Sequence, residues 1–418
     1  MNVLVIGNGA REHALCWKLR GSRSLTALYC APGNPGTERL AQNVSIAVDD
    51  IVGLAEFARS RKIDLTIVGP ELPLSLGIAD AFQARGLRIF GPSQEAARIE
   101  ASKSFAKEVM LGAGVATAAC KIFSDRASAA EHLAKSQLPI VLKADGLASG
   151  KGVFVCFSRA ETEEALEQLF GVLKIQRLVI EDHIQGREVS YMVATDGERA
   201  VPLASSHDYK RLLDNHEGPN TGGMGSVSPT PALPPEIEDR VLSEVIYPVL
   251  AEMRKRGTPF RGFLYAGLMV GDEGGIKVLE FNARLGDPET QVIMRRMESD
   301  FLELCYALSD PTGKAELPPI SWSKDAAVCI VAAAGGYPGT LQLGEEITGI
   351  EFAEMMPQGA VFLAGVQRTD NNRLVTAGGR VLSATAIGPT VAEAASRAYK
   401  VCDMIQFKGR QVRRDIGR

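Results

Sequence analysis

Residues 143–152 read Lys-Ala-Asp-Gly-Leu-Ala-Ser-Gly-Lys-Gly and lie between two apolar runs that favour β-strands. Three glycines and two lysines suit a loop that folds over phosphate groups, because backbone N–H groups and ammonium groups both attract anions. The stretch is not a P-loop: three residues instead of four separate Gly146 from Gly150, and Gly152 instead of Ser or Thr follows Lys151. It predicts a strand–loop–strand element that covers phosphates, with a flexible hairpin as the alternative.

Residues 280–284, Glu-Phe-Asn-Ala-Arg, end another apolar strand further along the chain. Side chains two positions apart on a strand share a face, so Glu280 and Asn282 can reach the same ion while Phe281 enters the core. Two oxygen donors, completed by nucleotide phosphates and water, are what Mg²⁺ usually accepts in proteins. Arg284 then suits a phosphoryl group in transfer. Together with residues 143–152, this stretch predicts a magnesium–nucleotide site.

A polar segment lies between these two stretches. It reads Asp-Tyr-Lys-Arg at 208–211 and Gly-Pro-Asn-Thr-Gly-Gly-Met-Gly at 218–225. Four glycines in eight residues do not form a stable helix or strand, and long irregular segments inside compact domains are usually functional. None of the five histidines has an evident cysteine or serine partner. The sequence therefore favours ligation through an activated phosphate over nucleophilic catalysis.

The first 100 residues alternate short apolar strands with helical patterns, which predicts a parallel, doubly wound sheet. The expected strands are Val3–Ile6, Leu25–Cys30, Leu65–Val68 and Leu87–Phe90. Glycine-containing turns follow these strands on one rim of the sheet and suggest a binding crevice. The first turn resembles a dinucleotide fingerprint, but Glu12 stands where the third glycine belongs, which argues against a nicotinamide cofactor. Arg11 and His13 suit a phosphate or a polar sugar instead.

Changes of pattern divide the chain into three predicted domains, 1–100, 101–320 and 325–418. A small α+β unit at about 115–188 is expected inside the second domain, and the stretch 311–323, with three prolines, is the expected linker. The third domain opens with an apolar strand and ends in a helix at about 391–404. The predicted fold class is α/β with α+β subdomains, in which an N-terminal parallel sheet precedes a mixed C-terminal domain.

The composition is that of an ordinary soluble protein, with 45% hydrophobic and 23% charged residues among 418. The net charge is −4 and no basic stripe stands out, which argues against nucleic acid as a partner. The seven cysteines lie singly, as in proteins of a reducing compartment. No signal-peptide pattern is present, and the longest apolar stretch, 326–334, is about half a membrane span. We expect a cytoplasmic protein with no membrane partner.

Several long motifs resemble the phosphoribosylamine–glycine ligase family (glycinamide ribonucleotide synthetases) of the ATP-grasp superfamily. They are residues 7–14, 143–152, 218–225, 262–269 and 280–289. The similarity runs in order from Met1 to about Ile416. It implies an ATP-grasp architecture: a Rossmann-like N-terminal substrate domain, a central ATP-grasp domain with a lid at about 115–188, and a C-terminal domain. It also implies a monomer.

The resemblance implies a step of purine biosynthesis, in which ATP, glycine and 5-phosphoribosylamine give ADP, phosphate and glycinamide ribonucleotide. Glycine's carboxylate would take the γ-phosphoryl group, and the ribosyl amine would attack the resulting glycyl phosphate. ATP binding is implied for Lys103, Lys143, Gly146, Gly150, Lys151, Gly152, Glu181 and Glu188. Of these, Glu181, with the residues up to Ile184, would contact adenine, and Glu188 the ribose. Binding of Mg²⁺ or Mn²⁺ is implied for Glu280 and Asn282, and catalytic roles for Arg284, Lys210 and Asp208.

The loop at 220–225, with Asp208 and Lys210, would face glycine and the sugar phosphate. Two features depart from the family pattern. The family usually has Gln-Asp-His-Lys-Arg where this chain has His-Asp-Tyr-Lys-Arg at 207–211, which puts a proton-transfer role for Tyr209 in doubt. The segment between Phe170 and Leu178 is shorter than usual, which trims a lid loop. Two alternatives stay open: another ATP-grasp carboxylate–amine ligase, and a nucleotide-binding regulatory protein without turnover.

Overall fold

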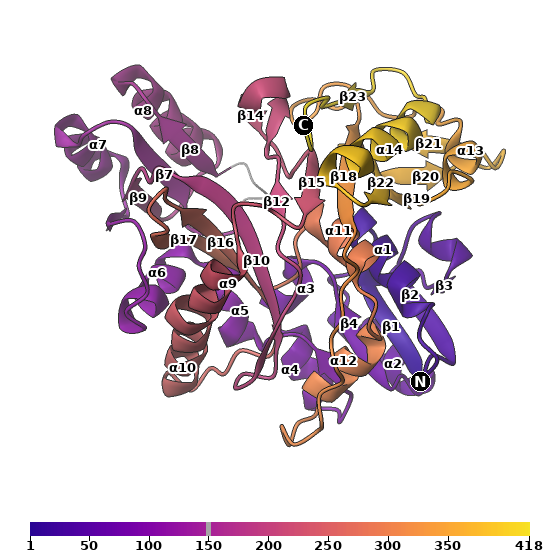
Figure 1. Cartoon of the computed structure of the whole chain (residues 1–418). Coiled ribbons are helices and arrows are strands. Elements are labelled where there is room, and N and C mark those ends of the chain that lie inside the picture. The colour runs from indigo at the N-terminus through magenta and orange to yellow at the C-terminus, as the bar shows by residue number, and fades with distance from the viewer. Residues whose placement is uncertain (148–151) are drawn as a thin grey trace.

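The N-terminal region forms a five-stranded parallel sheet whose strands alternate with helices, as the sequence predicts (Figure 1). The computed structural model describes residues 1–147 and 152–418. In the sheet order β3-β2-β1-β4-β5, the strands are β1 Asn2–Gly7, β2 Ala27–Pro32, β3 Gln42–Asn43, β4 Leu65–Val68 and β5 Ile89–Phe90. The helices are α1 Ala10–Leu19, α2 Ile51–Ser60, α3 Glu71–Ser75 and α4 Ile78–Gln83.

Two details of this region differ from the sequence pattern. Strand β3 was not predicted, because two residues are too few for an alternating pattern to be recognised. The helical spacing of residues 74–84 predicts one helix, but the structure has α3 and α4 with a break between them. Gly77 causes the break, since its φ of +82° is left-handed and cannot continue a right-handed helix.

The central region contains a four-stranded antiparallel sheet in the order β11-β10-β16-β17. Its strands are β10 Arg187–Thr195, β11 Ala200–Pro202, β16 Gly262–Val270 and β17 Ile276–Asn282. The helices of this region are α5 Gln94–Ala101, α6 Lys103–Gly112, α9 Pro235–Val241 and α10 Tyr247–Lys255. Side chains of this sheet share one hydrophobic core with the N-terminal sheet and its helices, so the two sheets are packed together through apolar contacts.

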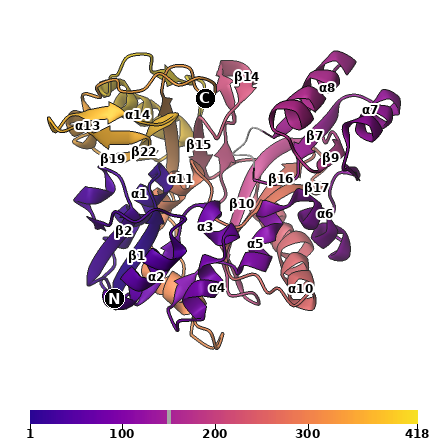
Figure 2. The same cartoon turned by 180° about the vertical axis from the view of Figure 1, so that it is seen from behind.

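A second antiparallel sheet, β6-β9-β7-β8, forms a small unit with its own hydrophobic core. Its elements are β6 Cys120–Phe123, α7 Arg126–Lys135, β7 Ile140–Ala144, β8 Val153–Cys156, α8 Arg159–Leu166 and β9 Leu178–Asp182. Residues 148–151 of the glycine-rich stretch, between β7 and β8, lie outside the described residues. This unit, called the lid below, lies on the far side of the molecule from the C-terminal sheet in both views (Figures 1 and 2).

The C-terminal sheet combines strands from two distant parts of the chain. Strands β18 Ala326–Ala333, β19 Gly359–Leu363, β22 Arg380–Gly388 and β23 Gln411–Val412 come from its C-terminal end. Strands β12 His207–Asp208 and β15 Gly225–Ser228 come from the polar segment and pair antiparallel, β12 with β15 and β15 with β18. The hairpin of β13 Arg211–Leu213 and β14 Glu217–Asn220 lies between β12 and β15 in the chain. The segment at 207–228 is therefore anchored on the C-terminal sheet.

The remaining elements connect these sheets. Helices α11 Glu289–Arg296 and α12 Phe301–Leu308 contribute to a core that also includes N-terminal strands and β18. Strands β20 Val366–Arg368 and β21 Leu374–Thr376 form a hairpin around residue 371, and α13 Ile350–Glu354 and α14 Val391–Met404 complete the C-terminal region. Within the described residues, every helix is too short or too polar to cross a bilayer.

Candidate active site

A cavity of about 1110 Å³ lies where the lid, the central sheet, the N-terminal sheet and the C-terminal sheet meet. Eleven of the residues predicted from sequence line it: Lys103, Lys143, Gly146, Gly152, Glu181, Glu188, Asp208, Lys210, Glu280, Asn282 and Arg284. Two further predicted residues, Gly150 and Lys151, lie outside the described residues. Residues more than 170 positions apart in the chain thus line one space.

Three lysines line the lid end of the cavity. Lys143, on β7, lies with its Nζ 2.9 Å from Glu181 Oε2 and donates to Leu279 O at 3.0 Å. Lys107 Nζ lies 3.2 Å from Glu181 Oε1, and Lys103 Nζ donates to Gly146 O at 3.0 Å. Burial lowers the pKa of both Lys103 and Lys107, because few water molecules solvate their charges. Glu181 pairs with Lys107 and Lys143, whereas Lys103 forms no ion pair among the described residues, which leaves its ammonium group for an anionic ligand.

Lys107 was not predicted from sequence, although a signal was present. Lys103 and Lys107 are four residues apart on α6, so they lie on the same helix face. The N-cap Ser102 sets this register, because its side chain accepts the Phe105 N–H and begins α6 at Lys103. Glu181, expected near adenine, uses its side chain for Lys107 and Lys143, and its backbone lies in β9 between β6 and β7.

The carboxylate–amide pair lies on β17. Glu280 and Asn282 line the cavity, and Phe281 between them, which also borders it, is 2% exposed and packs in the core. Burial acts to raise the pKa of Glu280, but Lys210, Lys143 and Lys103 together bring it below its ordinary value. Glu280 is therefore ionised at neutral pH. Within the described residues no three acidic, histidine or cysteine side chains gather to hold a metal on their own, so a cation here would need phosphate oxygens as well.

Arg284 connects β17 to the N-terminal region. Its Nη2 lies 3.1 Å from Glu100 Oε1 and donates to Asn282 Oδ1 at 3.3 Å, and its Nε lies 3.6 Å from Glu71 Oε2. Burial opposes the charge of Arg284, but Glu100 and Glu71 raise its pKa, so the guanidinium stays charged. Glu100 itself is buried, and its pKa is raised by that burial. These contacts hold Arg284 in place beside Asn282.

The other end of the cavity carries Asp208 and Lys210. Lys210 Nζ contacts Glu188 and lies 4.0 Å from Glu280 Oε1, so Glu188, expected near the ribose, is paired with a lysine. Burial, and then the charge of Glu289, raise the pKa of Asp208 well above 3.8. Asp208 Oδ1 has no hydrogen-bond partner among the described residues. Asp208 therefore holds a proton more readily than an ordinary carboxyl group, which suits a role in proton transfer.

Position 209, where the chain departs from the family pattern, faces the C-terminal residues of the chain. Tyr209 Oη accepts the Gly417 N–H at 3.2 Å, and the Arg413 guanidinium lies 4.9 Å from its ring centroid. Tyr209 also stacks on His216, with ring centroids 6.0 Å apart. His207 Nδ1 is 2.8 Å from Glu188 O. The Tyr209 hydroxyl thus anchors the end of the chain, and the structure gives it no contact with Asp208 or Lys210 side chains.

The first glycine turn binds the chain's own carboxylate. Glu12 Oε2 accepts the Gly9 N–H at 2.6 Å, and a Cβ at Gly69 would lie 2.0 Å from Glu12 Oε1. The glycines therefore leave room for Glu12, which explains why a glutamate stands at the third fingerprint position. Arg11 lines the cavity, but His13 faces β19 instead, where its Nδ1 accepts the Leu363 N–H at 2.9 Å.

Comparisons with known proteins agree with this arrangement. Family models for phosphoribosylglycinamide synthetase match the chain in three parts: the N domain at 1–100, the ATP-grasp (A) domain at 101–290 and the C domain at 327–418. The phosphoribosylamine–glycine ligase of Vibrio vulnificus (strain CMCP6) is 48% identical, over 100% of this chain and 98% of that protein. The enzyme of the same name from Salmonella typhi is 47% identical with the same coverage.

Comparison with solved structures points to the same family. The phosphoribosylamine–glycine ligase of Thermotoga maritima has a TM-score of 0.84 and 34% identity, over 99% of this chain and 100% of that one. A biotin carboxylase from Campylobacter jejuni, 16% identical with a TM-score of 0.73 over 98% of this chain and 92% of that one, shares the fold. The ATP-grasp architecture predicted from sequence is confirmed. The chain belongs to the phosphoribosylamine–glycine ligase (phosphoribosylglycinamide synthetase) family.

Proposed function

We propose that this chain ligates glycine to 5-phosphoribosylamine with ATP, giving glycinamide ribonucleotide, ADP and phosphate in purine biosynthesis. Family membership supports this reaction. The observation that carries the proposal is the single cavity that joins a lysine-rich end to an end with Asp208, Lys210 and the glycine-rich loop. A ligase that activates a carboxylate with ATP needs both a phosphate site and an acceptor site within reach of each other.

In this proposal the lysine-rich end holds the ATP phosphates. Lys103 and Lys143 contact phosphate oxygens, with Lys107 beside them, and Gly146 and Gly152 line the same end of the cavity. Glu280 and Asn282 hold Mg²⁺, since carboxylate and amide oxygens with phosphates and water match its preference. When bound, the cation neutralises phosphate charge. Mn²⁺ accepts the same oxygen ligands. Titrations of activity with Mg²⁺ and with Mn²⁺ compare how well each metal supports the reaction.

Arg284 then stabilises the transferring phosphoryl group, because Glu100 and Glu71 hold its charged guanidinium beside Asn282. The carboxylate of glycine attacks the γ-phosphorus of ATP, and ADP leaves. The ribosyl amine attacks the carbonyl carbon of glycyl phosphate, phosphate leaves, and one amine proton is lost. Asp208 accepts that proton in this scheme, because its raised pKa makes the carboxylate more basic than usual. Lys210 steadies the negative charge that develops next to Glu280.

We propose domains at 1–100, 101–320 and 325–418. The parallel sheet lies in the first, the sheet β11-β10-β16-β17 in the second, and most strands of the C-terminal sheet in the third, which β12 and β15 join from the second. We propose a monomer, as the resemblance to the family implies; sedimentation velocity measures this. We propose a cytoplasmic location, because all seven cysteines are free thiols and six of them are buried.

The experiment is a measurement of ADP release with ATP, Mg²⁺ and glycine, with and without phosphoribosylamine generated in the cuvette. We expect ADP only with both substrates, and a product with the mass of glycinamide ribonucleotide. ADP release with a different amine or acid would retain a carboxylate–amine ligase and reject this substrate pair. Folded protein that binds ATP but releases no ADP would support the regulatory alternative, which family membership does not favour.

A further inference from the structure

Gly222 is held by two side chains of the C-terminal region through both of its backbone polar groups. Its N–H donates to Tyr337 Oη at 2.9 Å, and its carbonyl oxygen accepts from Arg380 Nη1 at 2.5 Å. Tyr337 follows β18 in the chain, and Arg380 is the first residue of β22. Gly222 lies in the glycine-rich loop and lines the cavity. A wall of the active site is therefore fixed from outside the ATP-binding region.

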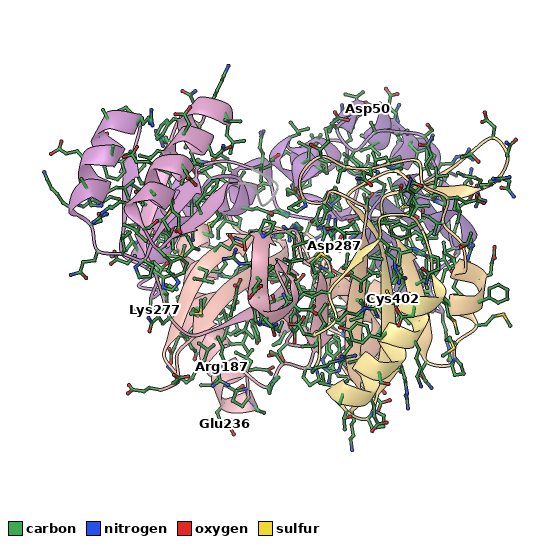
Figure 3. All side chains as sticks on the ribbon, turned by 90° about the horizontal axis from the view of Figure 1, so that it is seen from above. Asp50, Arg187, Glu236, Lys277, Asp287 and Cys402 are labelled. Atoms are coloured by element: carbon green, nitrogen blue, oxygen red, sulfur yellow. The ribbon has the colours of Figure 1, made fainter. Side chains whose placement is uncertain are left out.

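Arg380 connects this loop to a second part of the site. Its Nη1 also donates to Asp287 O at 2.5 Å, and its Nη2 lies 3.6 Å from Asp287 Oδ2. Asp287 lies shortly after β17, the strand that carries Glu280 and Asn282. Figure 3 shows Asp287 near the middle of the molecule, whereas Asp50 and Glu236 lie at its edges. Burial opposes the charge of Arg380, but Asp287 raises its pKa, so Arg380 stays charged.

The absence of a side chain at position 222 makes room for this contact. A Cβ on Gly222 would lie 3.2 Å from Arg380 Cζ and 3.3 Å from Tyr337 Oη, which is tighter than ordinary van der Waals contact. The neighbouring residue Thr221 is bonded differently, because its N–H and its hydroxyl both donate to Lys210 O at 2.8 Å. A shift of Gly222 would therefore be passed to Lys210 through Thr221.

We propose that Tyr337 and Arg380 are positioning residues that hold Gly222, and through it Lys210, in the geometry needed at the acceptor end of the cavity. This inference rests on the proposed function. Lys103, Lys107 and Lys143 lie on α6 and in the lid, and the hydrogen bonds and ion pairs of the described residues do not join them to Tyr337 or Arg380. The C-terminal region thus acts mainly on binding of the ligated substrates. It reaches the ATP end only through the pairing of Lys210 with Glu188, so its effect on ATP binding is smaller.

The first test is Tyr337→Phe, which removes only the hydroxyl that accepts the Gly222 N–H. Losing one hydrogen bond of ordinary strength changes an equilibrium by about 2- to 10-fold. We expect the KM for glycine or phosphoribosylamine to rise by about that factor, and the KM for ATP to rise less. Arg380→Met should give a larger rise in the same constants, and Arg380→Lys should recover part of it. An equal rise in the KM for ATP, or no rise in any KM, would overturn the proposal.

Arg373→Met is the matched control, because Arg373 belongs to the same region but pairs at the surface with Glu346. Its kinetic constants should equal those of the wild type. Should Arg380→Met not fold, Tyr337→Phe still decides the question. Hydrogen exchange separates this inference from the proposed function, because it needs no turnover: Tyr337→Phe should speed amide exchange at 220–225 even if the wild type has another substrate. Unchanged exchange there would reject the inference by itself.

Discussion

Glu280 is a half-buried carboxylate that stays ionised because lysines lie close to it. Burial acts to raise its pKa, and Lys210, Lys143 and Lys103 more than offset that effect. The carboxylate of Glu280 and the amide of Asn282 are too few ligands to hold a metal ion by themselves. Phosphate oxygens and water would have to complete the coordination. A substitution that removes the negative charge of Glu280 and keeps the shape of its side chain therefore isolates the contribution of that charge.

We predict that Glu280→Gln lowers turnover by about 100-fold or more and raises the Mg²⁺ concentration needed for half-maximal rate, as expected when one charge stabiliser is lost. ADP release against Mg²⁺ concentration measures both effects. Glu236→Gln is the control, because Glu236 is exposed and lies at the edge of the molecule in Figure 3. A near-wild-type rate for Glu280→Gln would reject the metal assignment.

Lys143 is the second residue at the site whose substitution we expect to affect a single function, the use of ATP. Its ammonium nitrogen lies 2.9 Å from Glu181 Oε2, and both residues line the cavity. We predict that Lys143→Ala raises the KM for ATP by about 10- to 100-fold, the range for a lost hydrogen bond to a charged group, and that it slows phosphoryl transfer. Calorimetric titration with ATP and steady-state kinetics measure these effects. Lys135→Ala, which changes an exposed lysine of the lid, should leave the KM for ATP and the rate of phosphoryl transfer unchanged. Unaltered ATP kinetics in Lys143→Ala would contradict the role of Lys143 in phosphate binding.

At the scale of elements, the β1–α1 turn shows how a familiar pattern can hold a different group. The glycines at 7, 9 and 69 surround the carboxylate of Glu12, which accepts the Gly9 N–H and caps α1. The dinucleotide fingerprint has a glycine where Glu12 stands, for close packing of helix on strand. Here the space between β1, β4 and α1 is filled by a charged side chain of the chain itself.

We predict that Gly69→Ala lowers the free energy of unfolding by about 1–3 kcal/mol, because the new methyl group would lie 2.0 Å from Glu12 Oε1 and displace it from the Gly9 N–H. Urea unfolding followed by circular dichroism measures the change. Gly275→Ala serves as the control, since no atom lies within 4 Å of a Cβ at that position. Equal stability of the two variants would mean that Glu12 moves without cost.

At the scale of the whole molecule, the N-terminal and C-terminal regions are joined by His13. Its Nδ1 accepts the Leu363 N–H of β19, and Asn34 Nδ2 donates to Leu363 O at 2.8 Å. Burial, and then the charge of Arg39, lower the pKa of His13 to about 3. The folded protein therefore keeps this histidine neutral at pH values where the unfolded chain, with a pKa near 6.5, is protonated.

Because the unfolded state binds the extra proton, stability falls as the pH falls from about 6.5 towards 3. At pH 5 this linkage lowers the free energy of unfolding by about 2 kcal/mol relative to neutral pH. We predict that His13→Asn, although less stable overall, loses less stability between pH 7.5 and pH 5 than the wild type. Thermal or urea unfolding at both pH values tests this. Parallel pH dependence in the two proteins would contradict it.

Much of the fold followed from local pattern. The alternation of apolar strands and helices predicted the parallel sheet of β1, β2, β4 and β5, because such patterns depend on neighbours along the chain. The side-chain alternation of β17 placed Glu280 and Asn282 on one face and Phe281 in the core, as expected from the geometry of a strand. The motifs of the family supplied the rest of the candidate site before the structure was known.

The sequence by itself determined the parallel sheet, the strands on either side of the glycine-rich stretch and the residue types gathered at the site. Only the tertiary structure decided that Lys107 joins Lys143 on Glu181, and that β12 and β15 pair into the C-terminal sheet. It also decided that Tyr337 and Arg380 reach Gly222. The physical reason is sequence separation: a helix or strand is set by residues a few positions apart, whereas Gly222 and Arg380 meet only after several sheets have packed together.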